Sequence, residues 1–272
     1  MTAHVIVNQG RVGDRAPFMI RGARLAGDEI ARRHGLERST VGTPSPALAD
    51  DWTESLPAAE RTLTELAAAV DETLGDGRTP IVLSSTCSAS LATLPVVLRH
   101  RPDTVVLYID GHGDFNTPDG TTTGYLGGMV LSGACGLWDS GHGDGVDPRR
   151  SVLVGSRDID DDERRLIAEH GVRLLPPSEV TPEAVLALVG SSPVWVHVDW
   201  DVLEPGYVPA DYIVPDGLTP TQMRSLFEAI PAEQLVGAEF AEFNAPEDES
   251  TSAEALEVLM TIVEPVVVSA AS

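Results

Sequence analysis

A regular alternation between short apolar runs and longer segments of helical spacing limits the possible folds more than any other feature. The apolar runs are rich in Val, Ile and Leu and predict about eight strands, at residues 4–8, 39–43, 80–85, 104–110, 151–156, 172–175, 193–199 and 234–243. Helical spacing recurs between them, at residues 22–34, 58–74, 162–170, 181–190 and 219–230. This alternation predicts an α/β fold, with a mainly parallel sheet and helices on both of its faces.

The length and composition are those of one domain. The 272 residues are 42% hydrophobic, which is enough for a sizeable core, and residues 1–272 are expected to form a single domain. Residues 42–57 and 139–150 are rich in loop-forming residues and are expected to be surface excursions. No segment approaches the roughly 20 apolar residues of a membrane-spanning helix, so a soluble, cytoplasmic protein is expected.

The charge of the chain excludes some partners. There are 42 acidic residues against 18 basic ones, for a formal net charge of −24, and such a surface repels nucleic acids and anionic membranes. We therefore expect a small-molecule partner. The acidity by itself has two explanations: a solvated acidic surface, or carboxylates gathered at strand ends to hold divalent cations.

The first local pattern that bears on this choice is the end of the strand predicted at 104–110. Asp110, His112 and Asp114 occupy alternating positions in the segment DGHGD, so an extended backbone can direct all three side chains the same way. An Asp- and Gly-rich turn would explain the same residues without any ligand.

A second strand end favours the metal hypothesis. Asp199 and Asp201 alternate in the same way after the apolar run at 193–199. Four carboxylates in one cleft would repel one another unless cations neutralise them or their pKa values rise. Carboxylates mixed with imidazole suit Mn²⁺ better than Zn²⁺ or Fe²⁺, and the number of carboxylates suggests two ions. The reaction class that this arrangement favours is metal-assisted hydrolysis.

These motifs resemble those of the arginase and agmatinase family of ureohydrolases. The family's Asp-His-Asp motif matches DGHGDFNTP, and its later Asp-x-Asp motif matches HVDWDVLEPGYVPA. The resemblance extends from about residue 80 to residue 248 and is weaker in the first seventy residues. It implies a three-layer αβα sandwich with a central eight-stranded parallel sheet, and a dinuclear manganese centre.

The resemblance also implies roles for the individual metal ligands. Asp110 and Asp199 would bridge the two ions, Asp114 would bind the first ion, and His112 with Asp201 would bind the second. The family mechanism uses a hydroxide that bridges the ions, and Asp114 would hydrogen-bond to it and relay its proton.

Further matches imply the substrate-binding residues. A Glu-x-Asn-Pro-like segment points to Glu242 as the residue that binds the guanidine head, where its charge complements a cationic or polar group. The stretch NTPDGTTTGYLGG resembles the loop that holds an α-carboxylate, which suggests Asn116, Thr121 and Thr123. The segment GSRDIDDDE suggests Asp160 for the α-amino group. Helix capping would equally explain these polar residues, but together they favour an amino-acid substrate over a bare amine.

The chain departs from the family pattern at two positions. A histidine that binds the first metal is replaced by Cys87, whose thiolate is itself a competent ligand but would also favour softer ions. A second histidine, thought to shuttle a proton, is replaced by Gly127. Since a general acid is worth ~10²–10⁴-fold in rate, hydrolysis of ordinary arginine should suffer.

A substrate whose hydrolysis needs less acid catalysis would explain why Gly127 replaces the histidine. An N-hydroxyguanidine is a much weaker base than a guanidinium and binds neutral. The combination of Cys87 and Gly127 resembles those family members that convert Nω-hydroxy-L-arginine to hydroxyurea and L-ornithine in D-cycloserine antibiotic biosynthesis. Two alternatives stay open: an arginase-, agmatinase- or formimino-type hydrolase acting on another substrate, and a metal-binding pseudoenzyme.

The C-terminal region bears on assembly. Family arginases often trimerise through an extended tail, whereas only 30 residues follow Glu242 here. The sequence therefore predicts a monomer.

Overall fold

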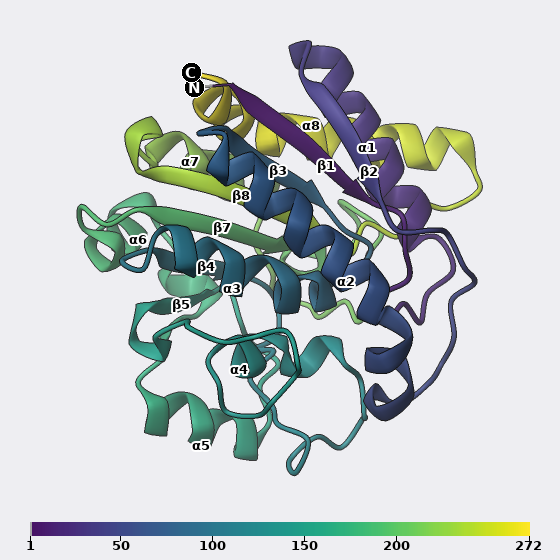
Figure 1. Ribbon diagram of the computed structural model, residues 1–272. Coiled ribbons are helices and arrows are strands. Elements are labelled where there is room, and N and C mark those ends of the chain that lie inside the picture. The colour runs from purple at the N-terminus through teal and green to yellow at the C-terminus, as the bar shows by residue number, and fades with distance from the viewer. Residues whose placement is uncertain (1) are drawn as a thin grey trace.

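The computed structural model describes residues 2–272, and its centre is one eight-stranded sheet (Figure 1). The strand order is β2-β1-β3-β8-β7-β4-β5-β6, and every neighbouring pair is parallel. The strands are β1 Ala3–Asn8, β2 Glu37–Val41, β3 Thr79–Leu83, β4 Val105–Ile109, β5 Ser151–Val154, β6 Arg173–Leu175, β7 Val194–Asp199 and β8 Leu235–Ala241. The prediction of eight strands in a mainly parallel sheet is confirmed.

Eight α-helices connect and cover these strands in the described part of the chain. They are α1 Met19–His34, α2 Trp52–Gly75, α3 Ser90–His100, α4 Val130–Ala134, α5 Asp161–His170, α6 Pro182–Val189, α7 Pro220–Ala229 and α8 Glu249–Ala271. Six short 3₁₀ segments lie at Cys87–Ala89, Gly127–Met129, Pro148–Arg150, Pro177–Glu179, Trp200–Val202 and Ala232–Gln234. Among residues 2–272, no helix combines the length and the apolarity needed to span a membrane.

The five helices predicted from periodicity are confirmed, whereas α3, α4 and α8 were not predicted. Residues 90–98 of α3 are all buried, so this helix lacks the polar face that produces a recognisable period. The expectation of a surface excursion over residues 42–57 is wrong at its end, because α2 already begins at Trp52. The carboxylate of Asp51 accepts a hydrogen bond from the Thr53 amide and caps that helix.

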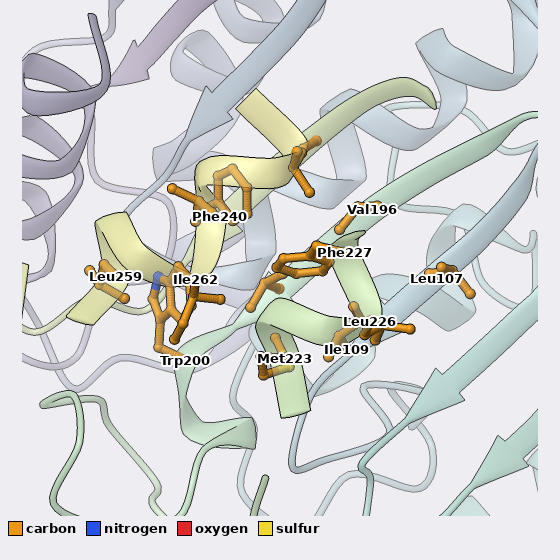
Figure 2. Packing of buried hydrophobic residues seen from close by; sticks show 14 of the residues in the cluster. Leu107, Ile109, Val196, Trp200, Met223, Leu226, Phe227, Phe240, Leu259 and Ile262 are labelled. Carbon is orange, nitrogen blue, oxygen red and sulfur yellow. The ribbon is translucent and has the colours of Figure 1, made fainter. Parts of the chain in front are cut away.

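The sheet separates two hydrophobic clusters, which gives three layers. One cluster includes side chains of α1, α6, α7 and α8, and the other those of α2, α3, α4 and α5. Successive residues of a strand face opposite clusters: Leu107 of β4 contacts the first and Tyr108 the second. Figure 2 shows the first cluster, with Phe227 of α7 packed near Val196 of β7. The expected three-layer αβα sandwich is confirmed.

The register of the central strands aligns their carboxyl ends. Tyr108 of β4 pairs with His197 of β7, and His197 pairs with Glu239 of β8. Residues that follow these three strands therefore emerge at the same edge of the sheet, which is where ligand sites of parallel sheets lie.

A close approach between α1 and the exit of β8 generates a stability prediction. A Cβ atom on Gly22 would lie 1.7 Å from the carbonyl oxygen of Phe243. We expect Gly22→Ala to lower the free energy of unfolding by about 1–3 kcal/mol, because the backbone of a packed layer must move. Urea denaturation measures the change.

Gly75→Ala, at the end of α2, is the matched control. No heavy atom lies within 4 Å of a Cβ atom placed on Gly75, so this variant should match or slightly exceed the wild-type stability. Equal stabilities for the two variants would contradict the close approach of α1 to Phe243.

Candidate metal centre

Four neighbouring strands deliver the polar side chains of the site. Cys87 begins the 3₁₀ turn after β3, Glu242 follows β8, Asp199 ends β7, and Asp110 follows β4. The sheet order β3-β8-β7-β4 places these strand ends side by side. Asp201 belongs to the 3₁₀ turn that extends β7. Segments far apart in the sequence thus converge at one edge of the sheet.

The potential metal-binding atoms form two adjoining groups. In each set named here, one ligand atom from every residue lies within 4.8 Å of the others. The sets are Asp110 with His112 and Asp201, Cys87 with Asp199 and Glu242, and Cys87 with Asp110 and His197. Because Cys87 and Asp110 each belong to two sets, the sets are contiguous and the arrangement has room for more than one ion.

Short hydrogen bonds fix the side of the site near His112. Its Nδ1 lies 2.8 Å from Oδ2 of Asp201 and 3.5 Å from Oδ1 of Asp110. The backbone amide of His112 donates to Oδ1 of Asp110 at 2.6 Å, and the amide of Asp201 donates to Oδ1 of Asp199 at 2.7 Å. The alternating positions of Asp110 and His112 therefore direct these two side chains together, whereas Asp114 belongs to none of the three sets.

Two acidic residues of the site have backbone conformations that are uncommon for side chains other than glycine. The φ angle is 47° at Asp114 and 69° at Glu242, and such conformations cost about 1–3 kcal/mol each. Hydrogen bonds hold both carboxylates. The hydroxyl of Tyr108 donates to Asp114 Oδ2 at 2.6 Å, and the amide of Cys87 donates to Glu242 Oε1 at 3.3 Å.

Burial makes these carboxyl groups unusually weak acids. Desolvation, followed by the charge of a neighbouring aspartate, raises the pKa of Asp114, Asp199 and Glu242 well above their usual values. The same causes raise the pKa of Asp201 to about 6.

The pKa values of Asp110, His112 and Cys87 are shifted in different directions or by different causes. Burial acts to raise the pKa of Asp110, but hydrogen bonding to His112 and its charge outweigh it, and the pKa is lowered. Burial opposes charge on His112, yet hydrogen bonds to Asp110 and Asp201 raise its pKa. Desolvation and the charge of Asp199 raise the pKa of the Cys87 thiol. Without a cation, the cluster therefore holds protons that a metal would displace.

The residues present fit divalent cations. Oδ2 of Asp110 and Oε2 of Glu242 are buried and accept no hydrogen bond from any residue between 2 and 272. Buried carboxylate oxygens without donors are costly unless a cation contacts them. Four aspartates and one imidazole suit Mn²⁺, and the Cys87 sulfur adds one softer ligand.

A cavity of about 310 Å³ opens above this cluster and extends towards α5. Asn116, Thr123 and Asp160, which the sequence suggests as substrate-binding residues, line it. Thr121 does not line it: its hydroxyl accepts a hydrogen bond from the Gly124 amide, and Thr122 faces the cavity instead. The turn at these three consecutive threonines directs Thr122 and Thr123, but not Thr121, to the cavity. The sequence alone does not define that turn.

Asp160 has two roles in the structure. Its Oδ1 accepts a hydrogen bond from the Glu163 amide at 2.8 Å and caps α5, while Oδ2 accepts one from the Asn116 side chain at 3.2 Å. The capping and the cavity-lining interpretations of this residue are therefore compatible.

Sequence analysis missed two tyrosines of the cavity, Tyr125 and Tyr212. The hydroxyl of Tyr125 donates to Glu242 Oε1 at 3.0 Å, its ring lies 5.3 Å from that of Tyr212, and the Arg15 guanidinium stacks on it at 4.9 Å. A Cβ atom on Gly127 would lie 2.4 Å from the Tyr125 ring. Tyr125 thus occupies the space into which a side chain at position 127 would extend. Its place two residues before Gly127 was the available signal.

The fold and this site together define a class of protein: a hydrolase built on a parallel αβα sandwich, with carboxylate and imidazole ligands at its strand ends. Residues 7–264 match the sequence model of the Arginase family. The chain belongs to the arginase family and is a ureohydrolase, and this family uses a dinuclear manganese centre.

Individual relatives agree with the family assignment. The chain is 56% identical over 268 residues to the N(omega)-hydroxy-L-arginine amidinohydrolase of Streptomyces lavendulae, covering 98% of both chains. It is 30% identical over 217 residues to the arginase of Bacillus caldovelox, covering 74% of this chain and 73% of the arginase. The solved structure of that arginase superposes with a TM-score of 0.80 at 26% identity, covering 97% of this chain and 98% of the arginase chain.

The protons held by the metal-free cluster generate a prediction about metal binding. The raised pKa values of Asp114, Asp199 and His112 mean that these groups keep their protons to a higher pH than usual and must release them to bind a cation. We therefore expect Mn²⁺ to bind more tightly at pH 8 than at pH 6. Binding at pH 7 should release more than about one proton per chain.

Titration calorimetry in two buffers of different ionisation enthalpy measures the proton count. The control is the same titration with Asp160→Asn, a change at the far end of the cavity, which should leave the count unaltered. A buffer-independent heat together with a pH-independent affinity would contradict the predicted exchange of protons for metal.

Proposed function

We propose that this chain hydrolyses Nω-hydroxy-L-arginine to hydroxyurea and L-ornithine with two Mn²⁺ ions bound at the strand ends. The residues that would hold the ions are Cys87, Asp110, His112, Asp114, Asp199 and Asp201. The observation that carries the choice of substrate is the position of Tyr125, whose ring fills the space beside Gly127.

The filled space bears on acid catalysis. A family histidine at position 127 would clash with the Tyr125 ring, and the tyrosine hydroxyl is engaged by Glu242. Proton delivery to the leaving amine is therefore weaker than in an arginase. An N-hydroxyguanidine suits this site better than a guanidinium, because it is a weaker base, binds neutral and is not repelled by divalent cations.

Each group of side chains has a distinct proposed task. When bound, two divalent ions neutralise the carboxylates and activate water for attack on the guanidine carbon. Glu242 binds the hydroxyguanidine head and is oriented by the Tyr125 hydroxyl. Asp114, whose Oδ2 accepts a hydrogen bond from the Tyr108 hydroxyl, would accept a proton from that water.

The substrate's amino-acid end is assigned to the opposite end of the cavity. Asn116 and Thr123 would bind its α-carboxylate, and Asp160 its α-amino group; all three line the cavity. Thr122 joins this set in place of Thr121. Residues with neutral donors near one acceptor carboxylate fit a zwitterionic end better than a bare amine.

The relative from Streptomyces lavendulae supports the proposal, since its name states the same activity and the match covers nearly the whole of both chains. We further propose that residues 1–272 act as one domain, as a monomer, in the formation of D-cycloserine. The last helix, α8, packs against α1 and α7 within the same chain.

The substrate assignment predicts a large difference between two compounds. With Mn²⁺ bound, kcat/KM for Nω-hydroxy-L-arginine should exceed that for L-arginine by about 10²-fold or more, the usual contribution of the general acid that position 127 lacks. Ornithine release measures both, and metal analysis should find about two ions per chain. Equal rates would favour an arginase, and no release from either compound would favour a metal-binding pseudoenzyme.

The contact between Tyr125 and Gly127 predicts how the missing histidine behaves when it is restored. Gly127→His alone should lower stability by about 1–3 kcal/mol and should not raise arginine hydrolysis, because the ring of Tyr125 obstructs the new side chain. The double variant Tyr125→Ala with Gly127→His should recover the stability. Thermal unfolding and ornithine release measure the two effects.

Gly128→Ala is the matched control, since no heavy atom lies within 4 Å of a Cβ atom at that position. A stable Gly127→His protein that still contains Tyr125 would contradict the proposed competition for space.

A further inference from the structure

A row of polar residues lies directly beneath the proposed metal ligands. Tyr108, His197 and Glu239 are paired across the neighbouring strands β4, β7 and β8. Asp110 and Asp199 are two positions further along β4 and β7, so they lie on the same face of the sheet as this row. All three residues of the row are fully buried.

The row is unexpected in the core of a parallel sheet. Such positions are normally apolar, as at Val106 and Trp195 in the layer below. A buried carboxylate and a buried imidazole are costly to desolvate unless every polar atom has a partner. These residues therefore need an explanation other than packing.

Hydrogen bonds link the row into one chain. Helix α3 contributes two hydroxyls: Ser90 Oγ donates to Glu239 Oε1 at 2.9 Å, and Thr93 Oγ1 donates to Glu239 Oε2. Ser90 Oγ also lies 3.1 Å from His197 Nδ1. The same nitrogen lies 3.3 Å from Glu239 Oε1, so Nδ1 faces both a hydroxyl oxygen and a carboxylate oxygen.

The opposite ring nitrogen of His197 faces the metal cluster. Its Nε2 lies 3.3 Å from the sulfur of Cys87, which lies 3.1 Å from Asp199 Oδ2. The Tyr108 ring stacks on the imidazole, with ring centroids 4.0 Å apart and planes 12° apart. Contacts on its face and at both nitrogens therefore fix the orientation of His197.

We propose that His197, oriented by Glu239 and Ser90, positions the Cys87 sulfur for metal binding. This inference rests on the proposed assignment of Cys87 as a ligand. A cysteine side chain is shorter than the histidine it replaces and has one free rotation, so a partner at its sulfur is needed to hold it towards the ion. His197 acts through Cys87 and is a positioning residue, as groups behind metal ligands commonly are.

A double-mutant cycle with Co²⁺ tests the proposal without any substrate. The full-length protein carries Cys135→Ala, so that Cys87 is its sole thiol. Glu239→Gln should weaken Co²⁺ binding at the site that contains Cys87 by about tenfold or more, as removal of such partners usually does. It should also diminish the thiolate-to-cobalt charge-transfer absorption.

The same change in a Cys87→Ala background separates positioning from a general structural role. There, Glu239→Gln should alter Co²⁺ affinity by less than about twofold, because the sulfur that it positions is gone. Equal losses in the two backgrounds would overturn the proposal. If Glu239→Gln does not fold, Ser90→Ala replaces it in the cycle, with an expected selective loss of about threefold or more.

The protein that carries only Cys135→Ala is the reference, and it distinguishes this inference from the proposed function. If its cobalt form has no charge-transfer absorption that depends on Cys87, the ligand assignment and the inference are both overturned. If that absorption is present and Glu239→Gln leaves it and the affinity unchanged, only the positioning role is overturned. His142→Gln, a change beside Glu60 and away from the cavity, is the matched histidine control and should behave as the reference.

Discussion

Mutual repulsion among buried carboxyl groups is the constraint on which the functional half of the structure depends. Asp110, Asp199, Asp201 and Glu242 are buried within one cluster, and Asp114 is buried beside the same cavity. Keeping them together requires a rigid scaffold and a source of positive charge or protons. The eight-stranded sheet supplies the scaffold, since four adjacent strands end at the cluster. Burial and the neighbouring charges raise the pKa values of Asp199 and Glu242.

Above the cluster, the Tyr125 ring occupies the space that a side chain at position 127 would need. This packing distinguishes the chain from the family motif, which has a histidine at that position. Gly127 is compatible with the structure because Tyr125 occupies the adjoining volume, and Tyr125 in turn contacts Glu242. One tyrosine therefore links the absence of a side chain at one position to the orientation of a carboxylate at another.

Support from below complements this arrangement. Tyr108 holds Asp114, and His197 contacts Cys87. Glu239 contacts His197 both directly and through Ser90. The site thus has two layers on the same face of the sheet, one of proposed ligands and one of residues that orient them. This order follows from the two-residue period of the strands, because positions two apart share a face.

The sequence by itself determined the elements with strong periodicity and the acidic side chains that follow two of the strands. Apolar runs predicted the eight strands, and alternation in DGHGD and DWD predicted which side chains converge, since local backbone geometry controls both. Only the tertiary structure decided that Thr122 replaces Thr121, that Tyr125 lies against Gly127, and that Glu239 lies behind His197. Those relations depend on turns and on a strand order that is not the chain order, and no local pattern encodes them.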